Sequence, residues 1–268
     1  MGHLTLTLPV GLLALSLLAA PAPAHAETPE EKGRAIAMET DKRDHGWGDS
    51  DVRFTMTLKN AHGDTSVRDL QIRSPEMNEP GLGDRSVTVF FKPRDIEGTA
   101  FLSHTKILDS DDQWIFLPVL KRVKRISSRN KSGPFVGSEF AYEDLVSQEV
   151  ERYTYKWLRD EPCGELTCHV TERYPVYEHS GYTKQVVWTD TTDYQPRKVE
   201  FHDRKGALLK TLLFKDYRQY LGQYWRSHTF DMVNAQTGKS TVLTFSDYVF
   251  MVGLSEQDFR KNRLKRAR

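Results

Sequence analysis

The chain of 268 residues is poor in several features that would narrow its class at once. It has only two cysteines, and its 38 Lys and Arg residues are balanced by 37 Asp and Glu residues, which gives a formal net charge of +1. A disulfide-dense scaffold needs many more cysteines, and a protein dedicated to nucleic acid carries a basic excess. The composition therefore excludes the first class and argues against the second.

Sequence motifs of catalysis are missing as well. The chain has no H-E-x-x-H zinc motif, no G-x-S-x-G nucleophile elbow, no phosphate-binding loop and no dinucleotide-binding glycine motif. The acids Glu139, Glu143 and Asp144 lie close together, but no nucleophile or histidine accompanies them, and we expect them to balance nearby bases. We therefore predict a protein that is not an enzyme and that needs no cofactor or metal ion.

The N-terminus carries an apolar run. Residues 4–20 are nearly all Leu, Ala, Val and Thr, and Ala24-His25-Ala26 has the small-x-small pattern of a cleavage site. We predict a cleaved signal peptide at 1–26 and export to the periplasm, with a retained membrane anchor as the alternative. About 240 residues remain, which we expect to form a single domain at 27–268.

The two cysteines, Cys163 and Cys168, lie close together in the segment PCGELTCHV. In an oxidising compartment such a pair is expected to form a disulfide across a tight hairpin. A metal site is the weaker alternative, because zinc needs four ligands and only His169 is near.

Strand-like patterns dominate the rest of the chain. A helix is expected over 28–44, with Thr28 as its N-cap and Pro29 in its first turn. The segment 51–59 alternates apolar and polar residues, and comparable segments continue to residue 250. We expect about ten or eleven antiparallel strands, several of them apolar on both faces. This pattern predicts a mainly β fold with a few helices, in which the sheet curls into a half-open barrel around the N-terminal helix.

A basic run follows the apolar segment QWIFLP. Six Lys or Arg residues and no acid occur at 121–131. In a strand, Lys121 and Arg125 would face one side and Arg122 and Lys124 the other. We predict that one pair lies at the rim of a cavity, facing an anionic lipid headgroup or an acidic partner, while the other faces solvent or the acidic cluster. A solvated strand edge that prevents aggregation is the alternative.

Four segments carry a family resemblance. They are DKRDHGWGDSDVRFTMTL (41–58), FFKPRDIEGTAFL (90–102), QWIFLPVLKRVKRISSRNKSGPFVGSEFAYEDL (113–145) and GLSEQDFRKNRLKR (253–266). In this order they resemble the outer membrane lipoprotein-sorting protein family, a LolA-like branch of periplasmic proteins. The resemblance implies a half-open antiparallel barrel like those of LolA and LolB, with a helical lid, an apolar cavity for acyl chains and no catalytic residues. It also implies a link to RND-type membrane exporters.

These observations together predict a periplasmic carrier or chaperone. It would bind a lipid, or the acyl chains of a lipoprotein, for transport toward the outer membrane. The alternative is an accessory subunit that docks on an RND-type exporter and carries no cargo. We expect a monomer without a nucleic-acid partner. The predicted cavity residues are Phe54, Met56, Leu58, Val89, Phe91, Leu102, Trp114, Phe116 and Phe135, and the predicted rim residues are Lys121, Arg122, Lys124 and Arg125.

Overall fold

The computed structural model describes residues 1–3, 26–77 and 79–267. The apolar run at 4–20 lies outside this part of the chain, so the signal peptide stays a prediction. No helix within the described ranges combines the length and the apolar character that crossing a membrane requires.

Fourteen strands and a few short helices make up the described residues. Helix α1 (Pro29–Arg43) begins at Thr28, whose hydroxyl accepts the Glu31 amide while the Glu31 carboxylate accepts the Thr28 amide, as the predicted N-cap requires. The strands are β1 (Asp49–Lys59), β2 (Thr65–Pro75), β3 (Leu82–Lys92), β4 (Ala100–Lys106), β5 (Asp112–Leu117), β6 (Arg122–Ile126), β7 (Tyr153–Cys163), β8 (Leu166–Pro175), β9 (Tyr182–Asp190), β10 (Pro196–Asp203), β11 (Leu208–Tyr220), β12 (Tyr224–Asn234), β13 (Ser240–Phe245) and β14 (Val249–Phe250). The 3-10 helices are η1 (Pro118–Leu120), η2 (Ser128–Asn130), η3 (Phe135–Gly137), η4 (Tyr142–Leu145), η5 (Val150–Arg152), η6 (Glu256–Phe259) and η7 (Lys261–Arg266).

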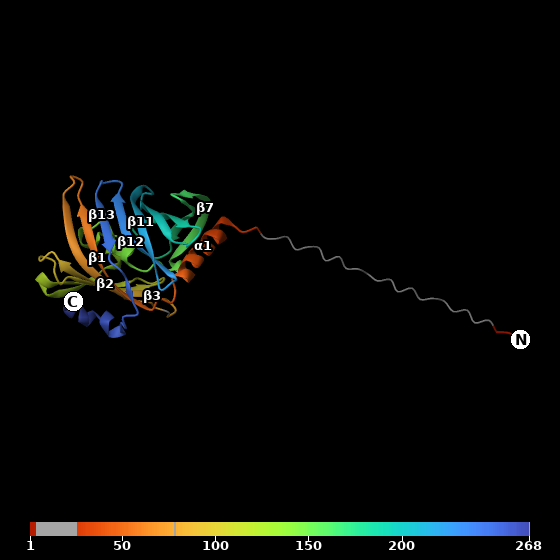
Figure 1. Ribbon diagram of the computed structural model, residues 1–268, viewed down its shortest axis with the longest axis horizontal. Coiled ribbons are helices and arrows are strands. Elements are labelled where there is room, and N and C mark those ends of the chain that lie inside the picture. Colours follow the sequence, from red (N-terminus) through yellow and green to blue (C-terminus); the bar gives the residue numbers. More distant parts are fainter. Residues whose placement is uncertain (4–25, 78, 268) are drawn as a thin grey trace.

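All the strands belong to one antiparallel sheet. Its order is β6-β5-β4-β3-β2-β1-β13-β12-β11-β10-β9-β8-β7, and β14 pairs with the start of β1. The sheet is strongly curved and not closed, because β6 and β7 are its two edges (Figure 1). The predicted unclosed antiparallel β fold is confirmed. The predicted count of ten or eleven strands is wrong: the described residues form fourteen, among them the edge strand of the basic segment 122–126 and the separate β14.

Apolar side chains cover both faces of the sheet. One cluster joins residues from both halves of the sheet, among them Met56, Phe101 and Leu212, so the sheet curls around this inner face. On the outer face, Val89 and Leu102 pack beneath the C-terminal residues Phe259 and Leu264. Several strands are apolar on both faces because both faces of the sheet are covered by other residues.

Helix α1 does not lie inside the curved sheet, contrary to our prediction. It packs mainly on the edge strand β7 (Figure 1). Only Gly33 and Ile36 of this helix are buried, so it has too little apolar surface to fill an interior. Gly33 permits the contact, because a Cβ there would lie 2.8 Å from the backbone nitrogen of Trp157. The interior is filled by residues 131–145, which we call the plug segment.

Candidate functional site

The plug segment carries an aromatic group onto the inner face of the sheet. Phe135 is 1% exposed, and its ring centroid lies 5.8 Å from that of Phe90 on β3 and 5.3 Å from that of Phe101 on β4. Tyr142 packs edge-on against Phe135 at 5.5 Å, and Phe140 is buried in the same cluster. The plug segment therefore occupies the apolar interior that an open half-barrel would offer to a ligand.

A buried ion pair fixes the plug segment to the sheet. The Lys210 ammonium on β11 lies 2.6 Å from the Asp144 carboxylate, and both side chains are at most 6% exposed. Asp144 also accepts hydrogen bonds from the Tyr182 hydroxyl at 2.7 Å and from the Ala141 amide at 2.7 Å. Burial and the nearby Asp144 carboxylate raise the pKa of Tyr182, so this phenol remains a donor.

A second polar contact joins the plug segment to the loop between β8 and β9. Glu143 accepts hydrogen bonds from the Gly181 amide at 2.8 Å and from the Ser180 hydroxyl at 3.0 Å. Burial raises the pKa of Glu143. The ammonium of Lys131 lies 4.0 Å from the ring centroid of Tyr177. Burial lowers the pKa of Lys131. Both ends of the plug segment are therefore held by buried polar groups.

Contrary to our prediction, the acidic cluster does not pair with the bases of β6, and of the basic run only the buried Lys131 lies near one of its acids, Glu143. Glu139 accepts a hydrogen bond from Asn234, whereas Glu143 and Asp144 bind the partners described above. The physical reason is that the plug segment folds back into the curved sheet and takes its acids with it. The bases of β6 remain outside.

A cavity of about 610 Å³ with a mixed polar and apolar lining lies where the plug segment meets the turns after β8, β10 and β12. Its lining includes both signs of charge and several neutral polar groups. The residues that contribute them include Ser132, Glu139, Asp203, Arg204, Lys205, Lys210, Asn234 and Lys239.

The nine predicted cavity residues fall on two opposite faces of the sheet. Four belong to the inner cluster around the plug segment, and five pack beneath the C-terminal segment on the outer face. Since the sheet separates the two groups, one cavity cannot be lined by all nine. The inner four are Phe54, Met56, Leu58 and Phe135, and the outer five are Val89, Phe91, Leu102, Trp114 and Phe116.

The sequence reasoning missed Phe90, Phe101, Ile115 and Phe140, which belong to the inner cluster. The run Val89-Phe90-Phe91 is apolar throughout, so alternation alone does not say which residue faces inward. The signal that separates the two faces is the strand pairing, which sets Phe90 opposite Leu70 on β2.

The four predicted rim residues lie at and near edge strand β6. Lys121 ends η1 with a left-handed backbone (φ 49°) rather than belonging to the strand. Arg125 lies opposite Trp114 and forms an ion pair with Asp112. The other three rim residues line a cavity of about 690 Å³ that we call the basic groove. Its lining residues are Lys121, Arg122, Val123, Lys124, Lys261, Asn262 and Lys265.

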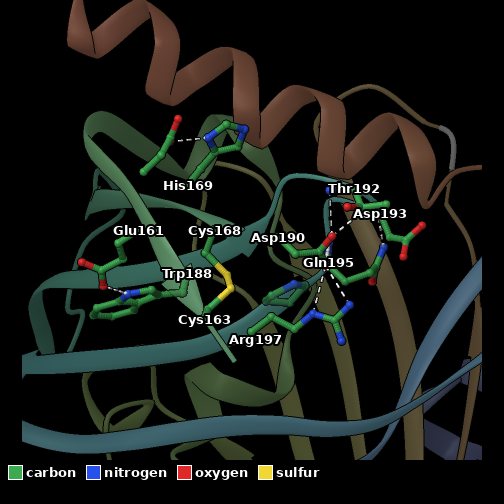
Figure 2. Close-up of a disulfide and its surroundings, with 12 residues drawn as sticks. Glu161, Cys163, Cys168, His169, Trp188, Asp190, Thr192, Asp193, Gln195 and Arg197 are labelled. Carbon is green, nitrogen blue, oxygen red and sulfur yellow. Dashed lines mark hydrogen bonds and ion pairs between the residues drawn. A yellow bond between two sulfur atoms is a disulfide. The ribbon is translucent and has the colours of Figure 1, made fainter. Parts of the chain in front are cut away.

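Cys163 and Cys168 form a disulfide between the end of β7 and the start of β8 (Figure 2). Cys168 is fully buried and packs with Trp188, whose indole donates to Glu161. Beside the disulfide, Asp190 accepts hydrogen bonds from a turn and from Arg197. These contacts hold a hairpin in place. Across residues 1–3, 26–77 and 79–267, no group of three or more His, Cys, Asp or Glu side chains is arranged to hold a metal ion.

The open, curled antiparallel sheet of this chain is a LolA-like fold. A LolA superfamily protein from Nitrosomonas europaea has this fold, with a TM-score of 0.69 and 22% identity over 86% of this chain and 98% of that chain. A family model described only as an uncharacterized protein matches residues 83–266. No functionally curated protein matches the sequence.

Two further crystal structures are much more similar. A domain from Vibrio parahaemolyticus, described provisionally as an outer membrane lipoprotein-sorting protein domain, is 57% identical over 88% of this chain and 99% of its own, with a TM-score of 0.86. A DUF1329 family protein from Desulfovibrio piger is 26% identical over 88% of this chain and 99% of its own, with a TM-score of 0.84. The chain therefore belongs to this outer membrane lipoprotein-sorting protein family.

Proposed function

We propose that the protein is a periplasmic carrier that binds an acyl chain of a lipid or lipoprotein on the inner face of its sheet. In this proposal residues 27–268 form one carrier domain, released by cleavage after residue 26, and no chemical reaction takes place. The description of the Vibrio relative as lipoprotein-sorting supports the general role. The cargo itself is inferred from the chemistry of the inner face.

The plug segment is the observation that carries the proposal. It contributes no strand to the sheet, and it places Phe135, Phe140 and Tyr142 where the sheet offers an apolar surface. An acyl chain is apolar, as the rings of these side chains are, and each buried CH₂ contributes about 0.8 kcal/mol. Cargo would therefore replace the plug segment on the inner face. The buried polar contacts of the plug segment would determine how much free energy its displacement requires.

Extraction of bound lipid tests this function. The protein is isolated from the exported fraction without detergent, and its organic extract is analysed by mass spectrometry. We expect acyl lipids in the wild type and a larger amount in Phe135→Leu, because the smaller side chain weakens the packing of the plug segment against the inner face of the sheet. Phe259→Leu is the matched control, since Phe259 is equally buried but lies on the outer face.

Equal background lipid in all three folded proteins, no higher than in an unrelated exported protein, would overturn the carrier function. A fluorescent fatty acid that binds none of them would do the same.

An accessory subunit of an RND-type exporter, without cargo, is the second candidate. The occupied inner face favours it, because the plug segment already satisfies the apolar surface without a ligand. Co-isolation with an exporter from cross-linked membranes, together with absence of bound lipid, would support this alternative over the first.

A further inference from the structure

We propose that the β5–β6 tip and the basic groove form a docking surface for an anionic lipid bilayer. The tip consists of η1 and Lys121, between the end of β5 and the start of β6. This inference goes beyond the proposed function, because docking requires no bound cargo.

The tip presents apolar side chains to solvent. Val119 is 83% exposed and Leu120 is 48% exposed. The turn that carries them is well defined, since the Lys121 amide donates to the Pro118 carbonyl at 3.0 Å. Lys121 adopts a left-handed backbone to close this turn, a conformation that is uncommon for a residue with a side chain. The two apolar side chains are thus held outward at a tight tip.

The basic groove lies directly beside this tip. Five of its seven lining residues are Lys or Arg, and none is an acid. Within the described part of the chain, these five cations form no ion pair with a protein carboxylate, whereas the neighbouring Arg125 pairs with Asp112. The cations are Lys121, Arg122, Lys124, Lys261 and Lys265.

Two acid-free segments of the sequence create this concentration of charge. Residues 113–138 and 259–268 contain no Asp or Glu, although the whole chain is nearly neutral. Helix η7 brings the second segment against β4, β5 and β6, and Figure 1 shows the C-terminal segment in blue along the outside of the sheet. The positive charge is therefore local and assembled by the fold.

An anionic bilayer fits both the apolar tip and the basic groove. Exposed apolar side chains enter the boundary between headgroups and acyl chains, while neighbouring Lys and Arg side chains attract lipid phosphates. Each cation close to an anionic surface strengthens binding by roughly fivefold, and the attraction weakens within about 8 Å at physiological salt. A soluble phosphate would use the cations but would leave Val119 and Leu120 exposed. An acidic protein would need a matching apolar pocket beside its acids to cover them, whereas every anionic bilayer offers both features.

Vesicle sedimentation tests the proposal with the protein purified from the exported fraction. The vesicles contain phosphatidylcholine alone or phosphatidylcholine with 30% phosphatidylglycerol. We expect binding at least tenfold stronger to the anionic vesicles at 50 mM NaCl, and largely lost at 500 mM NaCl. The triple variant Lys121→Gln, Arg122→Gln and Lys124→Gln should lose at least tenfold in binding. Val119→Ser with Leu120→Ser should lose about three- to fivefold in binding to the anionic vesicles at 50 mM NaCl.

Matched controls change the same residue types elsewhere on the surface. Lys59→Gln, Arg94→Gln and Lys156→Gln together remove three exposed charges, and Leu108→Ser removes an exposed apolar side chain from another turn. Both controls should bind as the wild type does.

Equal binding of wild type to both kinds of vesicle, or unchanged anionic binding by the triple variant, would overturn the proposal. Binding of inorganic polyphosphate without binding of vesicles would also overturn it, by assigning the groove to a soluble anion. Lipid extraction from the same variants distinguishes failure of docking from failure of the carrier function, since a carrier that no longer docks would still retain its cargo.

Discussion

Lys210 and Asp144 form an ion pair of 2.6 Å beneath the surface of the protein and join β11 to the plug segment. Lys210 also donates to the carbonyl oxygen of Glu139 at 2.8 Å. The same ammonium thus holds the plug segment at two points. This pair connects the stability of the fold with the accessibility of its inner face.

Replacing Lys210 with Met should be strongly destabilising. The substitution leaves Asp144 buried without its cation, and breaking one partner of a buried pair typically costs about 3–5 kcal/mol. Urea denaturation measures the free energy of unfolding. The double variant Lys210→Met with Asp144→Asn should recover part of this loss, because it removes the unpaired charge. A single variant as stable as the wild type would contradict the role assigned to the pair.

Asp84 gives a prediction for pH dependence. Burial, and less strongly the nearby Glu149 and Glu76, raise the pKa of Asp84 from 3.8 to about 7. The folded state therefore holds the proton more tightly than the unfolded state. This contribution to stability is complete below the unfolded pKa and is lost as pH rises toward about 7.

Asp84→Asn should consequently raise the free energy of unfolding at pH 8 by about 1–2 kcal/mol and change it little at pH 4. The whole shift, at about 1.4 kcal/mol per pKa unit, sets an upper limit of about 4 kcal/mol. Denaturation at both pH values measures the difference. Asp95→Asn, at an exposed position, is the control and should show no such trend. The same gain at both pH values would contradict the titration of Asp84.

Removing the disulfide with Cys163→Ala and Cys168→Ala should cost about 2 kcal/mol. A bond between residues five positions apart closes only a short loop, so its effect on the unfolded chain lies at the low end of the usual range. Chemical denaturation of the variant and of the wild type, with and without reductant, provides the measurement. Two free thiols in the unfolded, unreduced wild type would show that the bond is absent.

Gly33→Ala should destabilise the protein although alanine favours helix. A Cβ at this position would lie 2.8 Å from the Trp157 nitrogen and 3.0 Å from the Lys156 carbonyl carbon, both backbone atoms that cannot turn aside. We expect a loss of about 1–3 kcal/mol in thermal or urea unfolding, as for other overpacked contacts. Met38→Ala, at an exposed position of the same helix, should be nearly neutral. A stabilised Gly33→Ala protein would show that α1 does not press against β7.

Local signals in the sequence were sufficient for some elements. Thr28, Pro29 and Glu31 form a complete helix start within four residues, so α1 was predictable almost to the residue. The alternation of Phe54, Met56 and Leu58 likewise gave the inward side of β1, because its opposite residues are polar.

Other elements depend on contacts that alternation does not encode. Val136 adopts a positive φ of 47° between Phe135 and Gly137, a change of chain direction that alternation of apolar and polar residues does not predict. The position of the plug segment on the inner face follows from distant partners such as Lys210. The strand in the basic run was difficult to predict for a different reason. An edge strand pairs along one side, and it tolerates charged residues on both faces, so its sequence resembles that of a loop.

The pairing of β1 with β13 has a consequence for how the chain folds. Strands β1 to β6 and strands β7 to β13 each pair between neighbours in sequence. The β1–β13 pairing, for example Phe54 with Phe245, joins the two meanders, and the short β1–β14 pairing extends this seam. Closing so long a loop is slow, whereas neighbouring hairpins form quickly. The two meanders are therefore expected to form early and independently, and the joining of β1 to β13 to limit the folding rate. Substitutions at Thr55 or Thr244 in this seam should change the folding rate more than equally destabilising substitutions in an outer hairpin.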